Sequence, residues 1–217
     1  MEGKEHWEGV YRSRGETGVS WYQRRADVAL ELIRRLAPDT ATPIIDVGGG
    51  ASTLVDDLLL AGYQALTVLD LAASALTLAQ RRLGVAAQCV RWLDADVLHA
   101  PLPAATFGLW HDRAVFHFLT RPDDRARYVE QVRRAVRPGG HVIVAAFGLD
   151  GPAKCSGLDV VRYGPESLHD EFGGGFRLLQ STREEHRTPA GAMQPFVWCL
   201  CRREGRAAGG APGARGH

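Results

Sequence analysis

The sequence predicts an α/β protein with a doubly wound, mostly parallel sheet, and three observations indicate this class. An apolar, β-branched run at 43–47 leads into a glycine turn and then a helical pattern. A second apolar run, at 65–69, is followed by Asp70, 20 residues after Gly50. Strand and helix patterns then alternate to residue 147, which is the βαβ rhythm of a parallel sheet covered on both faces.

The elements follow from apolar periodicity and from proline and glycine positions. Trp7 and Tyr11 have helical spacing, and Pro38 ends the helix that follows them. The expected helices are 24–36, 54–61, 73–82, 123–136 and 165–172. The expected strands are 43–47, 65–69, 87–92, 107–110, 141–147, 176–183 and 195–203, with a turn at 137–140 and loops at 148–162 and 184–194.

Composition is that of an ordinary globular domain. The chain has 217 residues, 24% charged and 45% hydrophobic, which is enough for one domain with a substantial core. A formal net charge of +1 gives no reason to expect nucleic acid or a membrane surface as a partner. The first residues lack an apolar signal core and no run approaches membrane-spanning length, so we expect a cytoplasmic protein.

The four cysteines are too scattered for a disulfide framework. Cys199 and Cys201 lie two apart on an expected strand and therefore share a face. No second ligand pair with metal spacing accompanies them, so we expect buried free thiols and no metal site.

The turn after the first strand is the main functional signal. Glycines there let the backbone approach a ligand closely, because no Cβ stands in the way. Asp70 ends the neighbouring strand, where a carboxylate is placed to bind the two hydroxyls of a ribose. Both dinucleotides and S-adenosylmethionine are bound by such an arrangement. Thr53 stands where a dinucleotide site needs its third glycine, and Asp46 would repel a pyrophosphate but favour a sulfonium cation with an ammonium group.

Asp46, Gly48 and Gly50 resemble the first motif of the class I S-adenosylmethionine-dependent methyltransferases, with Ser52 in place of a frequent third glycine. The resemblance implies a Rossmann-like, seven-stranded sheet with an antiparallel C-terminal hairpin. It also implies a helical and lid segment at 1–39 and a methyltransferase domain at 40–203. Residues 204–217 are rich in Gly, Ala and Arg, which predicts a disordered tail. The expected cofactor is S-adenosyl-L-methionine, and the expected product is S-adenosyl-L-homocysteine.

The same resemblance assigns cofactor-binding roles to named residues. Asp46, Gly48 and Gly50 would hold the methionine end, and Asp70 the ribose. Leu71, Asp96 and Val97 would contact the adenine, with Asp94 as the competing register and two solvated loop acids as the alternative.

The aromatic residues at 5–22 have two interpretations. They pack a short helix onto the domain, or Trp21 and Tyr22 fold over the bound cofactor as a lid that excludes water. The second interpretation is similar to the N-terminal lids of several small-molecule methyltransferases.

The candidate catalytic residues follow the strand expected at 107–110, and they are His111, Asp112 and Arg113. Titratable groups at the carboxyl end of a central strand lie where an open α/β sheet keeps its site. His111, also a candidate cofactor contact, or Asp112 would orient or deprotonate the nucleophile. In the structural alternative, Asp112 caps the next turn and pairs with Arg113. His117 and Phe118 are expected to pack, and His186 lies in a polar loop expected near the site.

A small-molecule methyl acceptor is the first expectation, because a closing lid suits a buried pocket and no nucleic-acid charge is present. A protein side chain is the second. A module that binds the cofactor without catalysis and a dehydrogenase are the remaining alternatives.

Overall fold

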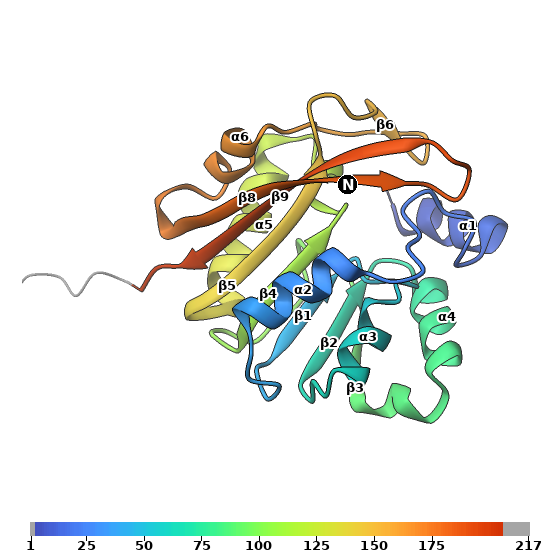
Figure 1. Ribbon diagram of the computed structural model, residues 1–217, viewed down its shortest axis with the longest axis horizontal. Helices are drawn as coiled ribbons and strands as arrows, with labels where there is room; N and C mark the ends of the chain where they lie inside the picture. Colours follow the sequence, from blue (N-terminus) through green and yellow to red (C-terminus); the bar gives the residue numbers. More distant parts are fainter. Residues whose placement is uncertain (1–2, 206–217) are drawn as a thin grey trace, which may run out of the picture.

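A computed structural model describes residues 3–205, and a single seven-stranded sheet forms its centre (Figure 1). The strand order is β3-β2-β1-β4-β5-β9-β8. Strands β1 to β5 pair in parallel, and β9 runs antiparallel to both β5 and β8. The predicted doubly wound sheet with an antiparallel C-terminal hairpin is therefore confirmed. The strands are β1 Ile44–Val47, β2 Leu66–Asp70, β3 Val90–Asp94, β4 Phe107–Arg113, β5 Val136–Phe147, β8 Phe176–Arg187 and β9 Met193–Arg203.

Helices cover both faces of the sheet (Figure 1). Trp110 and Tyr128 belong to the apolar cluster beneath α5, while Ile33 and Leu54 belong to the opposite cluster beneath α2 and α3. The helices are α1 Lys4–Arg14, α2 Asp27–Leu36, α3 Leu54–Leu60, α4 Ala73–Leu83, α5 Pro122–Ala135 and α6 Pro165–Asp170, with short 3₁₀ turns at Gly84–Cys89, Phe116–Phe118 and Gly173–Gly175. In the described part of the chain, no helix has the length and apolar character needed to span a bilayer.

Several predicted boundaries were wrong. The second helix begins at Asp27 and not at 24. The third strand begins at Val90, because the apolar run before it forms a 3₁₀ turn and leaves Val85 exposed. The fourth strand continues to Arg113, so the three candidate catalytic residues lie within it.

The C-terminal half also differs from expectation. The predicted turn at 137–140 is part of β5, where the ladder to β4 shifts register and Gly139 has a φ of 77°. Residues 137–140 have no partners on β4, so the predicted turn appears as an irregularity within the span of β5. The loop expected at 148–162 contains a small hairpin, β6 Lys154–Cys155 and β7 Leu158–Asp159. Strands β8 and β9 are longer than predicted, which shortens the loop between them to 188–192. Residues 206–217 of the predicted tail lie outside the described part.

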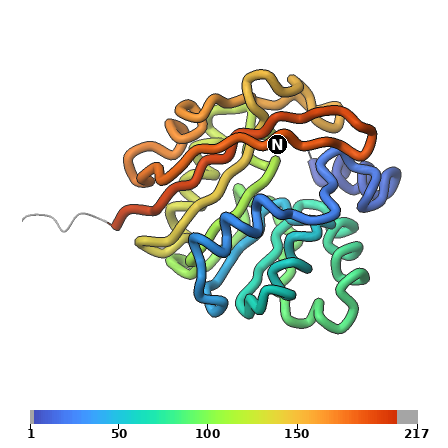
Figure 2. Tube along the Cα trace, viewed as in Figure 1, coloured from blue at the N-terminus to red at the C-terminus, as the bar shows by residue number. Residues whose placement is uncertain are grey.

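The N-terminal segment meets the β8–β9 hairpin beside the carboxyl ends of the parallel strands (Figure 2). His186 Nε2 lies 2.8 Å from the Ser20 carbonyl oxygen, and Gln23 donates to Glu184 at 2.9 Å. Two segments that are far apart in sequence thus enclose the same edge of the sheet.

Candidate active site

The glycine turn after β1 is packed too closely to hold side chains. Gly48 has a φ of 67°, and a Cβ there would lie 2.0 Å from Cγ2 of Val115. A Cβ at Gly50 would lie 2.8 Å from both Asp70 Oδ2 and the Tyr11 hydroxyl oxygen. The turn therefore brings bare backbone against the acid of β2 and against the N-terminal helix.

Asp70 is buried at the end of β2 and borders a cavity. Its Oδ1 accepts a hydrogen bond from the Ala72 backbone N–H at 2.8 Å. Burial raises the pKa of Asp70 to about 7, and the nearby Asp46 and Asp94 carboxylates add to the effect. A buried carboxylate facing a cavity is stabilised by a ligand that donates hydrogen bonds to it.

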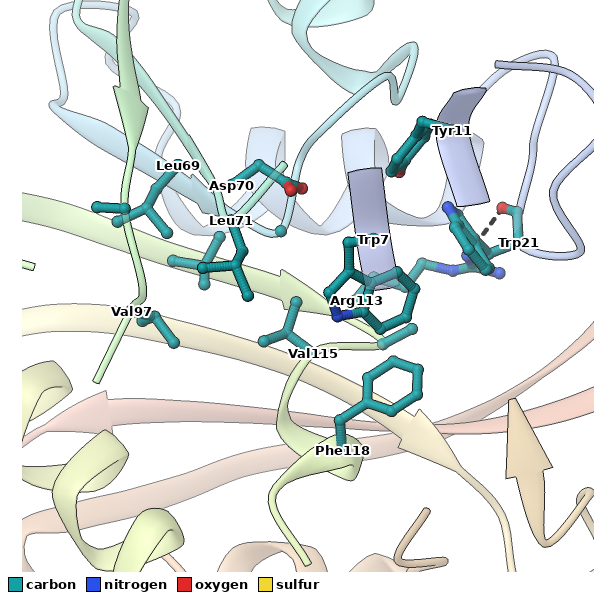
Figure 3. A pocket seen from close by; sticks show the side chains of 14 residues that line it. Trp7, Tyr11, Trp21, Leu69, Asp70, Leu71, Val97, Arg113, Val115 and Phe118 are labelled. Carbon is teal, nitrogen blue, oxygen red and sulfur yellow. Dashed lines mark hydrogen bonds between the residues drawn. The ribbon is translucent and has the colours of Figure 1, made fainter. Parts of the chain in front are cut away.

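One side of the cavity is apolar and is formed by the residues that follow β2 and β3. Leu71, Ala95 and Val97 line it, and Figure 3 shows Leu71 and Val97 on the same side as Asp70. The two candidate adenine acids make contacts of their own. Asp96 accepts the Leu98 N–H at 2.9 Å, and Asp94 contacts the Lys4 ammonium at 2.5 Å.

Aromatic residues of the N-terminal segment cover the cavity. Trp7, Tyr11 and Trp21 line it, and the Trp7 and Trp21 rings meet edge to face with centroids 5.8 Å apart. Tyr22 lines an adjoining cavity, which extends beneath the lid toward the glycine turn. The N-terminal segment is attached to the body by the Lys4–Asp94 pair and, through Glu16, to Arg82 at 2.8 Å.

His111 and Asp46 are paired across neighbouring strands. They are register partners on β4 and β1, and His111 Nδ1 lies 2.7 Å from Asp46 Oδ1. Because a carboxylate only accepts, Nδ1 is the donor in this bond. His111 Nε2 is buried and has no hydrogen-bond partner among residues 3–205. Both residues line the adjoining cavity together with Gly48.

Asp112 points to the opposite face of β4 and is fully buried. Its carboxylate accepts the N–H of Val115 at 2.8 Å, the N–H of Phe116 at 3.1 Å and the Tyr128 hydroxyl at 2.5 Å. It lines neither of the two adjoining cavities. The geometry gives no support to the predicted catalytic role of Asp112. The alternative prediction was that Asp112 caps the next turn and pairs with Arg113. Asp112 does cap the turn after β4, but the structure does not show the pair with Arg113.

Arg113 points to the same face as His111 and borders both cavities. Its guanidinium carbon lies 4.2 Å from the centroid of the Phe196 ring. The nearest acid is Glu184, at 3.7 Å from Arg113 Nε. Figure 3 shows the side chain beneath Trp7, with Nη1 donating to the Trp21 carbonyl oxygen at 3.3 Å.

The structure adds lining residues that were missed or misjudged in the sequence. Trp7, Val115 and Phe118 line the first cavity, although Phe118 was expected only to pack. The Trp7 and Phe118 rings meet edge to face at 4.9 Å. Ala114 also lines it, with a φ of 74°, which is a strained backbone of the kind found at functional sites. The helical spacing of Trp7 and Tyr11, which puts both on one face, was the available signal.

Two expectations about histidine and cysteine agree with the structure. His117 is fully buried, as expected for packing, and burial together with the Arg113 charge lowers its pKa to about 3. Cys199 and Cys201 are buried free thiols with their sulfurs 3.4 Å apart. Among residues 3–205, no group of three or more His, Cys, Asp or Glu is arranged to hold a metal ion.

Residues 45–144 match the model of a methyltransferase domain family. A mouse (Mus musculus) protein, the eEF1A lysine and N-terminal methyltransferase, is 22% identical over 145 residues. The match covers 64% of this chain and 20% of the mouse protein, so the chain spans about a fifth of that relative's length.

Solved structures share the fold at low sequence identity. One, described by the conversion of a disulfide bond into a thioacetal group during echinomycin biosynthesis, has a TM-score of 0.73 and 20% identity, covering 94% of each chain. An S-adenosylmethionine-dependent methyltransferase from Anabaena variabilis has a TM-score of 0.72 and 16% identity, covering 94% of this chain and 96% of the other. The Burkholderia thailandensis 1,6-didemethyltoxoflavin-N1-methyltransferase, solved with S-adenosylhomocysteine, has a TM-score of 0.69 and 19% identity, covering 93% and 88%.

The family match begins at Ile45 in β1 and ends at Val144 in β5, so it includes the glycine turn, Asp70 and the residues of β4. It agrees with the seven-stranded order and includes the buried carboxylate at the tip of β2. Residues 45–144 therefore match a methyltransferase domain, and the chain shares the fold of S-adenosylmethionine-dependent methyltransferases.

Proposed function

We propose that this protein methylates a small-molecule nucleophile held beneath the N-terminal aromatic lid. The observation that carries the proposal is the aromatic side of the cavity, where Trp7 and Trp21 line the same space as Asp70 and Arg113. An aromatic cover over a site reduces the access of water and strengthens the electrostatic interactions within it. A small acceptor fits inside such a space, whereas a protein side chain would have to enter past the lid.

The residues around the cavities suit the cofactor in three places. Asp70 would accept hydrogen bonds from the ribose hydroxyls, and Leu71 and Val97 would lie against the adenine. No Cβ stands between the turn at Gly48 and Gly50 and a bound ligand, so the backbone there could approach the ligand closely.

The methionine end would lie in the adjoining cavity, beside Asp46 and Gly48 and beneath Trp21 and Tyr22. When bound, the cofactor supplies a methyl group already activated by its sulfonium. Asp96, the other candidate adenine contact, lies one residue from two residues that line the first cavity.

The chain's own contribution is alignment, exclusion of water and removal of a proton where the acceptor carries one. We assign proton removal to His111 Nε2. Asp46 holds Nδ1 as the donor, so the neutral imidazole keeps its lone pair on Nε2, which has no partner among residues 3–205. Asp46 thus acts as a positioning residue for the base.

Titration calorimetry with S-adenosylhomocysteine is the first test of this function. We expect micromolar affinity, about 8 kcal/mol, and no comparable heat with NADH. An acceptor screen that records S-adenosylhomocysteine release then tests catalysis. Once an acceptor is found, His111→Ala should lower turnover on the order of 10²-fold, whereas Cys199→Ala, a matched buried control away from both cavities, should not.

A protein acceptor is the second candidate, and the mouse lysine and N-terminal methyltransferase is the observation in its favour. Supplying the cofactor with a labelled methyl group separates the two. Label in a small-molecule fraction supports the first proposal, and label that precipitates with protein supports the second. The neighbours also include a [4+2]-cyclase, with a TM-score of 0.67 and 15% identity, so cofactor binding without label transfer would indicate a non-methylating member of the fold.

A further inference from the structure

Arg113 is a buried cation with unused hydrogen-bond donors. Its side chain is 9% exposed, and a guanidinium has five N–H donors. Within residues 3–205, neither Nε nor Nη2 has a hydrogen-bond partner. Nη1 makes one long bond, to the Trp21 carbonyl oxygen at 3.3 Å. Burial of a cation whose N–H donors lack acceptors is unfavourable unless an anion accepts hydrogen bonds from them.

Glu184 balances the charge but does not satisfy the donors. Its Oε2 lies 3.7 Å from Arg113 Nε, which is beyond hydrogen-bond distance. Its two oxygens accept N–H groups from Gln23 and from Trp198, each at 2.9 Å. The fork of the guanidinium therefore stays available for a second, planar anion.

The guanidinium of Arg113 is oriented by its neighbours in a way that suits contact with a planar anion. The guanidinium lies over the Phe196 ring at 4.2 Å, and stacking of this kind orients its plane. His117 and His186 lie near it, and burial together with the Arg113 charge lowers the pKa of both imidazoles. Both imidazoles are therefore neutral near pH 7, so Arg113 supplies the positive charge at this place.

Arg113 borders the cavity that Asp70 and Leu71 also line, but its own contacts lie on the side of the N-terminal segment and the C-terminal hairpin. Its contacts are with the lid, through Trp21, and with the C-terminal hairpin, through Glu184 and Phe196. The cavity that it borders is lined by the aromatic rings of Trp7 and Phe118. An aromatic molecule that carries a carboxylate matches both features.

We propose that Arg113 binds a carboxylate on an aromatic methyl acceptor and thereby selects anionic acceptors. This inference rests on the proposed function, because it names the acceptor class of the same site. The methionine carboxylate of the cofactor has the same chemistry, and the experiment below distinguishes the two sources.

Benzoate is the probe, benzamide is its neutral counterpart, and tryptophan fluorescence reports binding to the free protein and to the S-adenosylhomocysteine-saturated protein. We expect benzoate to bind the saturated protein at least tenfold more tightly than benzamide. Arg113→Gln should weaken benzoate at least tenfold and change S-adenosylhomocysteine affinity less than threefold. Arg113→Lys, which keeps the charge without the fork, should be intermediate. Glu184→Gln should strengthen benzoate, and the exposed control Arg183→Gln should change nothing.

Three results would overturn the inference. They are benzoate binding weaker than about 10 mM in the wild-type protein, equal benzoate affinity in wild-type and Arg113→Gln proteins, and competition between benzoate and S-adenosylhomocysteine. Competition would assign Arg113 to the cofactor's carboxylate. If Arg113→Gln does not fold, the Arg113→Lys and Glu184→Gln titrations carry the same test. Failure of S-adenosylhomocysteine to bind would instead contradict the proposed function, and benzoate titration of the free protein would still test Arg113.

Discussion

The ends of β2 and β4 carry two aspartates that look alike in the sequence and differ in the structure. Asp70 and Asp112 both end or nearly end an apolar strand, and both are buried. Burial raises the pKa of Asp70 to about 7 and that of Asp112 to about 6. Burial and a raised pKa therefore do not distinguish a binding carboxylate from a structural one in this protein.

The difference lies in what surrounds each carboxylate. Asp112 is enclosed by two backbone N–H groups and the Tyr128 hydroxyl, and it borders neither cavity beneath the lid. Asp70 lies against the bare glycine turn and forms part of a cavity wall. We therefore expect the carboxylate that faces a cavity to bind ligand, and the one that donors of the chain enclose to stabilise the fold.

The largest effect should come from Asp112→Ala. The substitution leaves the N–H groups of Val115 and Phe116 and the Tyr128 hydroxyl buried without their acceptor. We expect the free energy of unfolding to fall by roughly 3–5 kcal/mol, measured by urea denaturation. Cofactor affinity of the folded fraction should be unchanged. A variant of full stability that has lost turnover would return Asp112 to the catalytic residues.

Asp70→Ala should have the opposite profile. Loss of charge-assisted hydrogen bonds to the ribose should lower S-adenosylhomocysteine affinity by roughly 2–3 kcal/mol, measured by calorimetry. The free energy of unfolding should not fall, because burial of the carboxylate disfavours its charged form in the folded protein. Asp94→Ala is the matched control at the tip of β3, where the carboxylate is partly exposed. A greater loss from Asp94→Ala than from Asp70→Ala would show that the ribose lies elsewhere.

The pH dependence of S-adenosylhomocysteine binding should be set by the ionisation of Asp70. The pKa of Asp70 is about 7 in the folded protein, against about 3.9 in an unfolded chain. The folded protein thus holds a proton that the unfolded chain has lost, so Asp70 lowers stability as pH rises from about 4 to 7. Ribose binding needs the ionised form, so S-adenosylhomocysteine affinity should fall about tenfold per unit below pH 7. Calorimetry at pH 5.5, 6.5 and 7.5 measures this, and a slope that persists in Asp70→Ala would assign it to another group.

The residues proposed to hold the cofactor could be grouped from the sequence because their signals are local. Asp46, Gly48 and Gly50 are close together in sequence, and Asp70 follows at the distance that one βα unit requires. The rhythm of strands and helices likewise predicted the sheet, which the structure confirms.

The positions of the residues considered for the acceptor were less predictable, because they depend on which face of a strand each residue occupies. His111, Asp112 and Arg113 were placed directly after the strand expected at 107–110, but they lie within β4, where successive side chains alternate. His111 and Arg113 therefore border the cavities, and Asp112 enters the core. The contacts of Arg113 with Glu184 and Trp21 join residues far apart in sequence, which no local pattern reports.

The smallest effect should come from Tyr128→Phe, which tests the enclosure of Asp112 without removing the carboxylate. The hydroxyl donates to Asp112 Oδ2 at 2.5 Å and accepts from Trp110 Nε1 at 2.9 Å, so its loss leaves one acceptor and one donor short. Asp112 keeps its two backbone donors, so we expect a loss of about 1 kcal/mol in the free energy of unfolding.

The double variant Tyr128→Phe, Asp112→Ala extends this test. It should cost less than the sum of its parts, because the two side chains share one hydrogen bond. Urea denaturation of the four proteins measures this coupling. S-adenosylhomocysteine affinity should be equal in the wild-type and Tyr128→Phe proteins. A Tyr128→Phe protein that loses as much cofactor affinity as Asp70→Ala would show that the core beneath α5 and the cavity beneath the lid are not separate.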